Sequence, residues 1–346
     1  MTTTTSDAGA DPQPPEGDEA GDGPVVVAVV GPTATGKSAL AVALALALEG
    51  EIVNADASAL YRGMDIGTAK PTPAERRGVP HHQLDVLDVT QEASVAAYQQ
   101  GARADLAAIT ARGRVPILVG GSGLYVRAAL DHLDIPPTDP AIRARLQAEA
   151  AAQPAAGTAG LDSLRARLAA LDPVAAQRIE PNNVRRIIRA LEVIELTGRP
   201  FSATMPERRH LRPTVMIGLT LAREVLDARI QARTRGMWDA GLVAEVEHLL
   251  ALGLERGRTA RTALGYAQTI QQLRGVLSQT EAIDATAAAT RRFARRQESW
   301  FRPDPRITWL PADAPDLLDR ALDVVEAAST ATAALPDAHG AMTDNG

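Results

Sequence analysis

The amino-acid sequence predicts an α/β protein in which a parallel sheet forms the core and a helical domain interrupts it. Apolar runs rich in Val and Ile alternate with segments whose apolar residues recur at helical spacing. A glycine-rich turn directly follows the first apolar run, and the alternation stops after residue 130. Strands that alternate with helices along a chain typically form a parallel sheet with the helices on its faces.

Five segments have the composition of buried strands. The first, VVVAVV (25–30), is a continuous apolar run, which is typical of a parallel strand covered on both faces. The others are EIVNAD (51–56), VPILVGG (115–121), TVMIGLTL (214–221) and RITWL (306–310). Helical spacing predicts helices at 37–49, 94–112, from about Ser122, 223–236, 239–252, 262–277, 280–301 and 314–327. We therefore assign residues 25–130 and 211–327 to the α/β core.

Residues 131–210 differ from the rest of the chain because no strand pattern occurs in them. Apolar residues recur at helical spacing over 138–152, 160–171 and 182–197. This segment is predicted to be a helical insertion domain. The two ends of the chain, 1–24 and 328–346, are polar and lack an apolar pattern, so we expect both tails to be disordered.

The composition excludes several classes of protein. The chain of 346 residues has no cysteine, so it has no disulfide framework, thiolate nucleophile or zinc–cysteine site. No apolar run reaches the roughly 18 residues that cross a bilayer, and the first residues have no signal-peptide pattern. We expect a cytoplasmic protein that does not associate with a membrane and acts as a monomer.

The net charge of −6 arises at the ends of the chain. Residues 1–24 contain six acidic residues and no Lys or Arg, and residues 327–346 contain two acidic residues and no Lys or Arg. The remainder is slightly basic, so the acidic net charge does not exclude a nucleic-acid partner. Of the 36 basic residues only Lys37 and Lys70 are lysines. In an arginine-rich sequence, a retained lysine indicates a need for a compact ammonium group.

The turn after the first strand has the sequence of a phosphate-binding loop. It matches G-x-x-x-x-G-K-[ST] in full and lies between a predicted strand and a predicted helix, as that motif requires. Its residues are Gly31, Pro32, Thr33, Ala34, Thr35, Gly36, Lys37 and Ser38. The glycines permit the tight path, the amides and Lys37 bind phosphate oxygens, and the Ser38 hydroxyl can bind Mg²⁺. The core is therefore predicted to be P-loop NTPase-like and to bind a di- or triphosphate.

Asp56 ends the second predicted strand. The carboxyl ends of parallel strands border the crevice in which such sheets bind ligands. A carboxylate at this position can hold Mg²⁺ or accept a proton from a nucleophile. It can also cap the turn that follows the strand.

Five segments together resemble one family. They are the phosphate loop, DASALYRGMDIGTAKP (56–71), VGGSGLYVRA (119–128), NNVRRIIRALEV (182–193) and RRQESWFR (295–302). In this combination they are similar to the P-loop isopentenyltransferase family, in particular its members that act on tRNA. The resemblance extends from about residue 25 to residue 310 without a large gap.

The resemblance implies a reaction. Such enzymes transfer a dimethylallyl group from dimethylallyl diphosphate to the exocyclic amine of an adenosine and release diphosphate. The adenosine lies immediately 3′ of the anticodon in tRNAs that read codons beginning with U. The phosphate loop then holds the diphosphate rather than the γ-phosphate of ATP, with Mg²⁺ as cofactor. The implied partners are the tRNA anticodon stem-loop, whose target base is flipped into a channel through the core, and the prenyl donor, which enters from the other side.

The resemblance also implies roles for single residues. Asp56 matches the catalytic aspartate that accepts the proton of the amine. Ser122 matches a residue that hydrogen-bonds the target adenosine, although it is equally suited to cap the next helix. Arg223 matches an arginine that reaches the diphosphate, or it is a solvated residue at a helix start. Lys70 lies in a loop that is expected to line the tRNA face, or it is a solvated loop lysine.

Arginines on two predicted helices are expected to contact the tRNA. In the helix that contains RRFARRQESWFR (291–302), five arginines share one arc, and Phe293, Trp300 and Phe301 share another. We expect the aromatic side to pack and the arginine side to bind phosphates; the alternative is an ordinary amphipathic helix with solvated arginines. The helical insertion is likewise expected to contact tRNA. The residues assigned to tRNA binding are Asp56, Ala57, Ser58, Ala59, Arg185, Arg186, Arg189, Tyr266, Arg295 and Arg296.

Three other functions compete with tRNA prenylation. A P-loop small-molecule kinase, or an isopentenyltransferase that acts on free AMP or ADP, would share the core. Neither needs the insertion at 131–210 or an arginine-lined helix near the C-terminus. A nucleotide-dependent RNA-binding module without chemistry would not need Asp56 at a strand end with Ser122 opposite it. We therefore predict a tRNA-modifying prenyltransferase.

Overall fold

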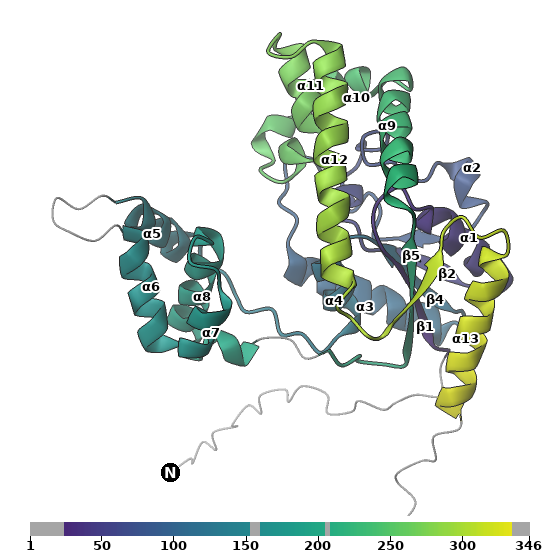
Figure 1. Cartoon of the computed structure of the whole chain (residues 1–346), viewed down its shortest axis with the longest axis horizontal. Coiled ribbons are helices and arrows are strands. Elements are labelled where there is room, and N and C mark those ends of the chain that lie inside the picture. Colours follow the sequence, from purple (N-terminus) through teal and green to yellow (C-terminus); the bar gives the residue numbers. More distant parts are fainter. Residues whose placement is uncertain (1–23, 153–159, 205–207, 334–346) are drawn as a thin grey trace, which may run out of the picture.

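The computed structural model describes residues 24–152, 160–204 and 208–333 (Figure 1). Within them, six parallel strands form one sheet in the order β3-β2-β4-β1-β5-β6. The strands are β1 (Val26–Val30), β2 (Glu51–Asn54), β3 (His81–His82), β4 (Pro116–Gly120), β5 (Thr214–Thr220) and β6 (Ile307–Pro311). Because all pairs are parallel, the carboxyl ends of the strands lie at one edge of the sheet.

The α/β class predicted from the sequence is confirmed, with one additional strand. β1 and β4 are buried along their whole length, which agrees with their continuous apolar sequences. β3 escaped prediction because a strand of two residues leaves no periodic pattern. It lies at the edge of the sheet, where His81 and His82 are in register with Ile52 and Val53 of β2.

Helices cover both faces of the sheet, and each face has its own apolar layer (Figure 1). Leu44, Ile117 and Ile217 belong to the layer beneath α1 and α13, whereas Leu106 and Leu118 belong to the layer beneath α3 and α4. The bounds are α1 (Lys37–Ala47), α3 (Val95–Ala111), α4 (Gly123–Leu130) and α13 (Leu317–Ala333), with the short turns η1 (Ser58–Leu60) and α2 (Pro73–Arg76) between β2 and β3.

The helix α13 corrects the predicted end of the ordered core. It continues to Ala333, so the expectation of a disordered tail from residue 328 is wrong for residues 328–333. Val325 is buried, and Ala328, three residues further along the helix, packs against the same apolar layer, which holds this turn in place. Residues 1–23 and 334–346, which make up the remainder of the two predicted tails, lie outside the described part of the chain.

A group of helices projects beyond the carboxyl edge of the sheet (Figure 1). α9 and α12 pack against each other through Leu226, Ile230, Ala287 and Ala294. A second apolar cluster joins α10 and α11 to the segment after β2. The elements are α9 (Arg223–Asp239), α10 (Leu242–Ala251), η3 (Leu254–Arg256), η4 (Ala260–Thr262), α11 (Tyr266–Leu273) and α12 (Gln279–Phe301).

A separate helical body lies beside this core (Figure 1). We use that name for α5 (Pro140–Ala151), α6 (Gly160–Leu171), α7 (Pro173–Arg178), α8 (Val184–Thr197) and η2 (Phe201–Thr204). It has its own apolar centre, which includes Leu146, Leu164 and Leu191. The short helix α7 was not predicted, whereas α5, α6 and α8 follow the periodic segments of the sequence.

The two segments that connect the helical body to the core meet at Asp131 and His210. These residues form an isolated antiparallel bridge, and the backbone N–H of Leu211 donates to the carbonyl oxygen of Leu130 at 2.8 Å. The Asp131 carboxylate is 1% exposed and accepts hydrogen bonds from Arg306 at 2.7 and 3.1 Å. This ion pair ties both connections to the start of β6.

Candidate active site

The phosphate loop lies at the carboxyl end of β1 and lines a pocket. Gly31 and Gly36 have φ angles of 127° and 93°, in the region that favours glycine. A Cβ atom on Gly31 would lie 2.8 Å from the carbonyl oxygen of Leu219 on β5, so the loop approaches the neighbouring strand too closely for another residue. The Thr35 hydroxyl donates to the carbonyl oxygen of Pro32 at 2.9 Å and holds the loop closed.

Two cationic side chains meet at this loop. The Lys37 ammonium donates to the carbonyl oxygen of Pro32 at 2.6 Å, and Nη2 of Arg233 on α9 donates to Oγ1 of Thr33 at 2.7 Å. Loss of hydration and the nearby Arg233 lower the pKa of Lys37 to about 7, against the opposing effect of Asp56. Because the two cations repel each other, an anion between them is strongly favoured, and the pocket is suited to a polyphosphate.

Asp56 is the second residue after β2 and lines the same pocket. Its backbone N–H donates to Oδ1 of Asn54 at 3.1 Å, and its own Oδ1 accepts from the backbone N–H of Ser58 at 2.9 Å. Asn54 also donates to the carbonyl oxygen of Gln83 at 3.0 Å, which anchors the turn to the end of β3. The capping role anticipated for Asp56 is thus realised through one carboxylate oxygen. The other oxygen is available to a ligand in the pocket.

The residues after Asp56, which the sequence assigned to tRNA contact, form the turn η1. Ala59 is buried and lines the pocket. Ala57 and Ser58 are half-buried. A ligand that enters the pocket therefore reaches Asp56 and Ala59 together.

Gln297 of α12 joins the two sides of the pocket. Its Oε1 accepts from the backbone N–H of Thr33 at 2.8 Å, and its Nε2 donates to the carbonyl oxygen of Gly121 at 3.0 Å. Sequence reasoning missed this residue, because a glutamine among arginines looks solvated. The available signal was its spacing: Gln297 lies three residues after Ala294 and four before Phe301, and both of these are buried.

Ser122 follows Gly121 and precedes the first residue of α4. Its hydroxyl makes no capping hydrogen bond, so the capping alternative is wrong for the side chain. Its backbone N–H donates to the carbonyl oxygen of Ala55 at 3.3 Å, which brings the residue beside the Asp56 turn. Ser122 is not among the residues that line the pocket, whereas Gly120 and Gly121 directly before it are.

The alternative that Lys70 is a solvated loop lysine is wrong. Its side chain is 2% exposed. The ammonium donates to the carbonyl oxygen of Tyr61 at 2.9 Å and forms ion pairs of 2.6 Å with Asp65 and Asp85. Three acceptors around one nitrogen fit an ammonium and not a planar guanidinium. Lys70 therefore fixes a loop that forms one wall of the pocket.

Arg223 does not line the pocket, which corrects its predicted contact with the diphosphate. Its guanidinium pairs with Glu298 of α12 instead. Arg233, ten residues further along α9, occupies the place that the sequence interpretation gave to Arg223. The sequence offered no signal for Arg233, since nothing local distinguishes it from the other arginines of that helix.

Tyr266 is fully buried, which contradicts its predicted approach to an anticodon loop. Its hydroxyl donates to Oε1 of Glu245 at 2.5 Å, and burial beside this carboxylate raises the pKa of Tyr266 far above its usual range. Oε2 of Glu245 accepts the backbone N–H of Ile66 at 2.8 Å. A Cβ atom on Gly67 would lie 2.4 Å from the Tyr266 ring. Tyr266 thus supports the loop that carries Lys70 and does not present its ring to a partner.

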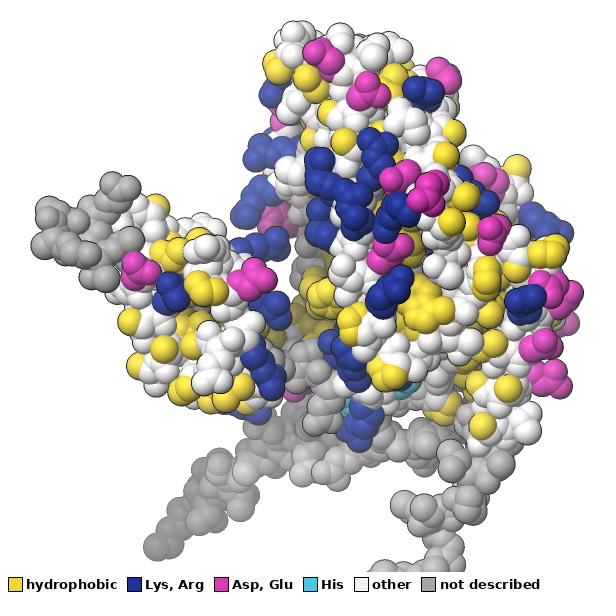
Figure 2. All heavy atoms as spheres, in the orientation of Figure 1, with side chains coloured by type: hydrophobic (Ala, Val, Ile, Leu, Met, Phe, Trp, Pro, Cys, Tyr) yellow, Lys and Arg dark blue, Asp and Glu magenta, His cyan; other side chains and the backbone are white. Residues whose placement is uncertain are grey.

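The arginines assigned to tRNA binding differ in their surroundings. Arg185, Arg186, Arg295 and Arg296 are exposed. Arg189 is engaged within the protein: it donates to the carbonyl oxygens of Pro136 and Pro137 and pairs with the buried Glu192. Figure 2 shows basic side chains gathered along α12 and on the flank of the helical body that faces it.

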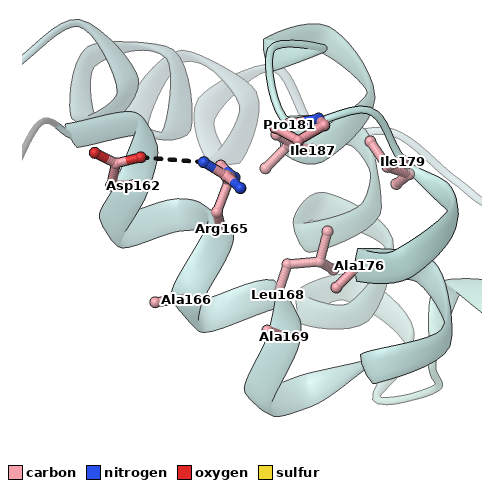
Figure 3. A pocket seen from close by; sticks show the side chains of 9 residues that line it. All are labelled: Asp162, Arg165, Ala166, Leu168, Ala169, Ala176, Ile179, Pro181 and Ile187. Carbon is pink, nitrogen blue, oxygen red and sulfur yellow. Dashed lines mark hydrogen bonds and ion pairs between the residues drawn. The ribbon is translucent and has the colours of Figure 1, made fainter.

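The helical body contains a separate cavity of about 330 Å³ (Figure 3). Apolar side chains such as Leu168, Ile179 and Ile187 form most of its wall. Its two charged lining residues, Asp162 and Arg165, pair with each other at 3.3 Å. The described residues that line it include no nucleophile or phosphate-binding loop, so we place the chemistry in the pocket beside Asp56.

The protein groups around the phosphate loop fit a magnesium ion that is shared with a polyphosphate. The Ser38 hydroxyl is exposed at the first turn of α1, and the Asp56 carboxylate lines the same pocket. Among the described residues, no cluster of three His, Cys, Asp or Glu side chains could hold a metal by itself. Magnesium retains several water ligands and binds through one or two protein oxygens and substrate phosphates, which suits this donor set.

Comparison with known proteins decides the family. The model of the IPP transferase family matches residues 59–304, which is more than half of the chain. The chain belongs to the IPP transferase family. The matched region of this chain includes four residues that line the pocket: Ala59, Lys70, Arg233 and Gln297.

The similarity to individual relatives extends over most of this chain. The chain is 60% identical to a tRNA dimethylallyltransferase of Kineococcus radiotolerans, over 89% of this chain and 98% of that protein. It resembles the crystal structure of a tRNA isopentenylpyrophosphate transferase from Bacillus halodurans, with 39% identity, a TM-score of 0.64, and coverage of 89% and 99%. A eukaryotic dimethylallyltransferase studied while acting on tRNA shares 25% identity with a TM-score of 0.71, over 87% of this chain and 77% of that one.

No helix in the described part of this family member combines the length and apolarity that a membrane span needs.

Proposed function

We propose that this protein transfers a dimethylallyl group from dimethylallyl diphosphate to the exocyclic amine of an adenosine in tRNA and releases diphosphate. The adenosine is the one immediately 3′ of the anticodon in tRNAs that read codons beginning with U. One observation carries the proposal: a single carboxylate, Asp56, lies in the pocket that the phosphate loop lines. Membership of the IPP transferase family and about 60% identity to tRNA dimethylallyltransferases support it. Neither a kinase nor an enzyme of free AMP is favoured.

Asp56 acts as the general base in this proposal. The exocyclic amine of adenine is a weak nucleophile, and it must lose a proton as its nitrogen bonds to C1 of the prenyl donor. The Asp56 turn is held by Asn54 and Ser58, so its carboxylate has a defined position from which to accept that proton. The Ser122 hydroxyl, which is free of the helix cap, hydrogen-bonds the same base and orients it.

The phosphate loop stabilises the leaving group. As the bond between C1 and the diphosphate oxygen breaks, negative charge increases on the diphosphate. Lys37 and Arg233 are positioned at the loop to stabilise that charge. Magnesium, when bound, would supply further positive charge to the same oxygens, and the Ser38 hydroxyl would hold it.

The helical body and α12 bind the anticodon stem-loop in this proposal. Arg185 and Arg186 on the helical body, with Arg295 and Arg296 on α12, are exposed and bind phosphates. The turn at Asp56 and Ala59 receives the extruded adenine. The enzyme acts as a monomer in the cytoplasm, which sedimentation and cell fractionation test.

The decisive experiment uses the whole protein, Mg²⁺ and radiolabelled dimethylallyl diphosphate. One reaction contains an anticodon stem-loop with adenosine on the 3′ side of the anticodon, a second contains the same RNA with guanosine at that position, and a third contains AMP. We expect label in the first RNA alone. Label in AMP alone would assign the protein to free nucleotides, and no label in any reaction at several Mg²⁺ concentrations would overturn prenyl transfer.

A further inference from the structure

Trp300 near the end of α12 is unusually exposed for its residue type. It is 48% exposed, although the sequence interpretation placed it on the packed side of the helix. The buried stripe of α12 runs through Ala294, Gln297 and Phe301, and only Phe301 of the three aromatic residues in this segment is fully buried. Trp300 precedes Phe301 by one residue, which turns its side chain about 100° away from that stripe.

The exposed ring lies beside the pocket. A Cβ atom on Gly123 would lie 1.9 Å from Cδ1 and Nε1 of Trp300, so the indole packs directly onto the first residue of α4. Gly123 follows Ser122, and Gln297, one helical turn before Trp300, lines the pocket and binds Gly121. The indole is thus anchored on one edge against Gly123, two residues after the pocket-lining Gly121, and about half of the residue is open to solvent.

The surroundings of Trp300 are cationic. An open groove on α12 is lined by Arg292, Arg295, Arg296, Ser299 and Trp300, with no acidic residue among them. The Arg296 guanidinium lies over the Phe293 ring at 5.7 Å from its centroid. Phe293 and Trp300 are seven residues apart, which separates them by roughly 10 Å along the helix axis. Rings and guanidinium groups therefore alternate along one strip of α12.

We propose that Trp300 is a stacking platform for the unpaired nucleotide next to the target adenosine. This inference rests on the proposed function, because it takes the anticodon loop as the occupant of the groove. A base leaves its stack when it enters the pocket, and its neighbour loses a stacking partner. An exposed indole beside the pocket replaces that partner, while the arginines bind the flanking phosphates. Single-stranded RNA is recognised by this combination of aromatic rings and basic side chains.

The experiment measures stacking without any prenyl donor. Two anticodon stem-loops carry 2-aminopurine, one at the nucleotide 5′ of the target adenosine and one at the nucleotide 3′ of it. The wild-type protein, Trp300→Phe, Trp300→Leu and the remote surface variant Leu252→Ala are titrated into each RNA. Leu252 is 53% exposed at the end of α10, so its substitution controls for loss of an exposed apolar side chain.

We expect the wild-type protein to quench 2-aminopurine at one of the two positions. Trp300→Phe keeps most of this quenching, because a smaller aromatic ring still stacks. Trp300→Leu loses it and weakens stem-loop binding roughly 5- to 150-fold, the range for removal of one base–aromatic stack. Leu252→Ala behaves as the wild type. Thermal unfolding of each variant confirms that the protein remains folded.

Unchanged quenching at both positions in Trp300→Leu would overturn the proposal, as would equal loss in Trp300→Phe and Trp300→Leu. Failure of the proposed function is visible separately. If the stem-loop binds and stacks on Trp300 but receives no label from dimethylallyl diphosphate, the reaction assignment fails and the platform stands. If the stem-loop fails to bind the wild-type protein, both fail.

Discussion

The side-chain oxygen of Gln297 accepts a hydrogen bond from the backbone N–H of Thr33 at 2.8 Å, although the two residues are 264 positions apart in the sequence. The amide nitrogen of the same side chain donates to Gly121. One buried glutamine on α12 therefore sets the distance between the phosphate loop and the turn after β4. The shape of the pocket depends on a helix that the sequence interpretation linked only to RNA.

Replacement of Gln297 by leucine is expected to weaken diphosphate binding. The substitution leaves the Thr33 N–H and the Gly121 carbonyl without partners, at about 1–3 kcal/mol each, and releases the loop. We expect the Kd of Mg-diphosphate to rise about 5- to 150-fold in isothermal titration calorimetry. Gln231→Leu is the matched control, because Gln231 bridges α9 and α12 at the surface. A Gln297→Leu affinity equal to that of the control would show that the loop holds its own shape.

The lysine side chains are expected to report the charge balance of the pocket. The chain has two lysines, so labelling lysine Cε with ¹³C gives two signals. Loss of hydration and Arg233 lower the pKa of Lys37 to about 7, so one signal should titrate with a midpoint near neutrality. Diphosphate stabilises the charged ammonium and should move that midpoint upward. Lys37→Arg identifies the signal by removing it. A midpoint near the ordinary lysine value of 10.5 in the free protein would contradict the geometry.

The substitution Asp56→Asn is expected to lower the rate of prenyl transfer by about two to four orders of magnitude, the usual scale for loss of a general base. The amide keeps an oxygen that can accept the Ser58 N–H, so the turn and RNA binding should persist. Single-turnover kinetics with saturating stem-loop measure the rate, and gel-shift titration measures the binding. Asp88→Asn, at an exposed ion pair with Arg62, serves as the control. Unchanged turnover in Asp56→Asn would remove this carboxylate from the chemistry.

Removal of Arg295 and Arg296 is expected to flatten the salt dependence of RNA binding. Each phosphate contact contributes about 0.7–0.9 to the slope of log Kd against log salt concentration, so the double alanine variant should lose about 1.4–1.8. The control is the double variant Arg112→Ala with Arg320→Ala, which removes the same charge from elsewhere on the surface. Equal slopes in the two double variants would show that the α12 arginines are only solvated.

The ion pair at the base of the helical body is expected to matter for stability. Although burial alone would raise it, hydrogen bonds from His210, Arg306 and Arg127 hold the pKa of Asp131 well below its usual range. The ionised carboxylate therefore stabilises the fold above the ordinary aspartate pKa, and that contribution is lost as the pH falls further. Arg306→Met should cost about 3 kcal/mol in urea unfolding at neutral pH, because it leaves a buried charge with fewer partners.

The same substitution should also reduce the loss of stability between about pH 5 and about pH 3. Arg320→Met, which breaks an exposed pair with Asp316, should cost less than about 1 kcal/mol. A similar cost for the two variants would mean that Asp131 is held adequately by Arg127 and His210 alone.

Local sequence patterns were sufficient for five of the six strands in the described sheet and for one side of the site. The phosphate loop directly follows β1, and Asp56 and Ser122 are each the second residue after a strand, so their positions depend on a few neighbouring residues. Arg233 and Gln297 reach the pocket only because α9 and α12 pack over the carboxyl edge of the sheet. The spacing along α12 could show that Gln297 is buried, but the contact of either helix with the phosphate loop depends on tertiary packing.

The sequence also did not predict which polar side-chain groups bind within the protein. Lys70, Arg189 and Tyr266 all occur in segments with a functional appearance, but the side chain of each binds another part of the same chain. Trp300 shows the opposite case, since an aromatic residue expected in the core lies half-exposed. Whether a long side chain faces inward depends on what packs beside it, which a single helix period does not specify.

The helical body leaves and re-enters the core at a single point, where Asp131 bridges His210 and Leu211 binds Leu130. The two cut ends are thus adjacent, and a short turn between them would close the chain. The strand order of the α/β core does not depend on the eighty or so residues between them. Exchange of the helical body for another segment would accordingly leave the phosphate loop and Asp56 as they are.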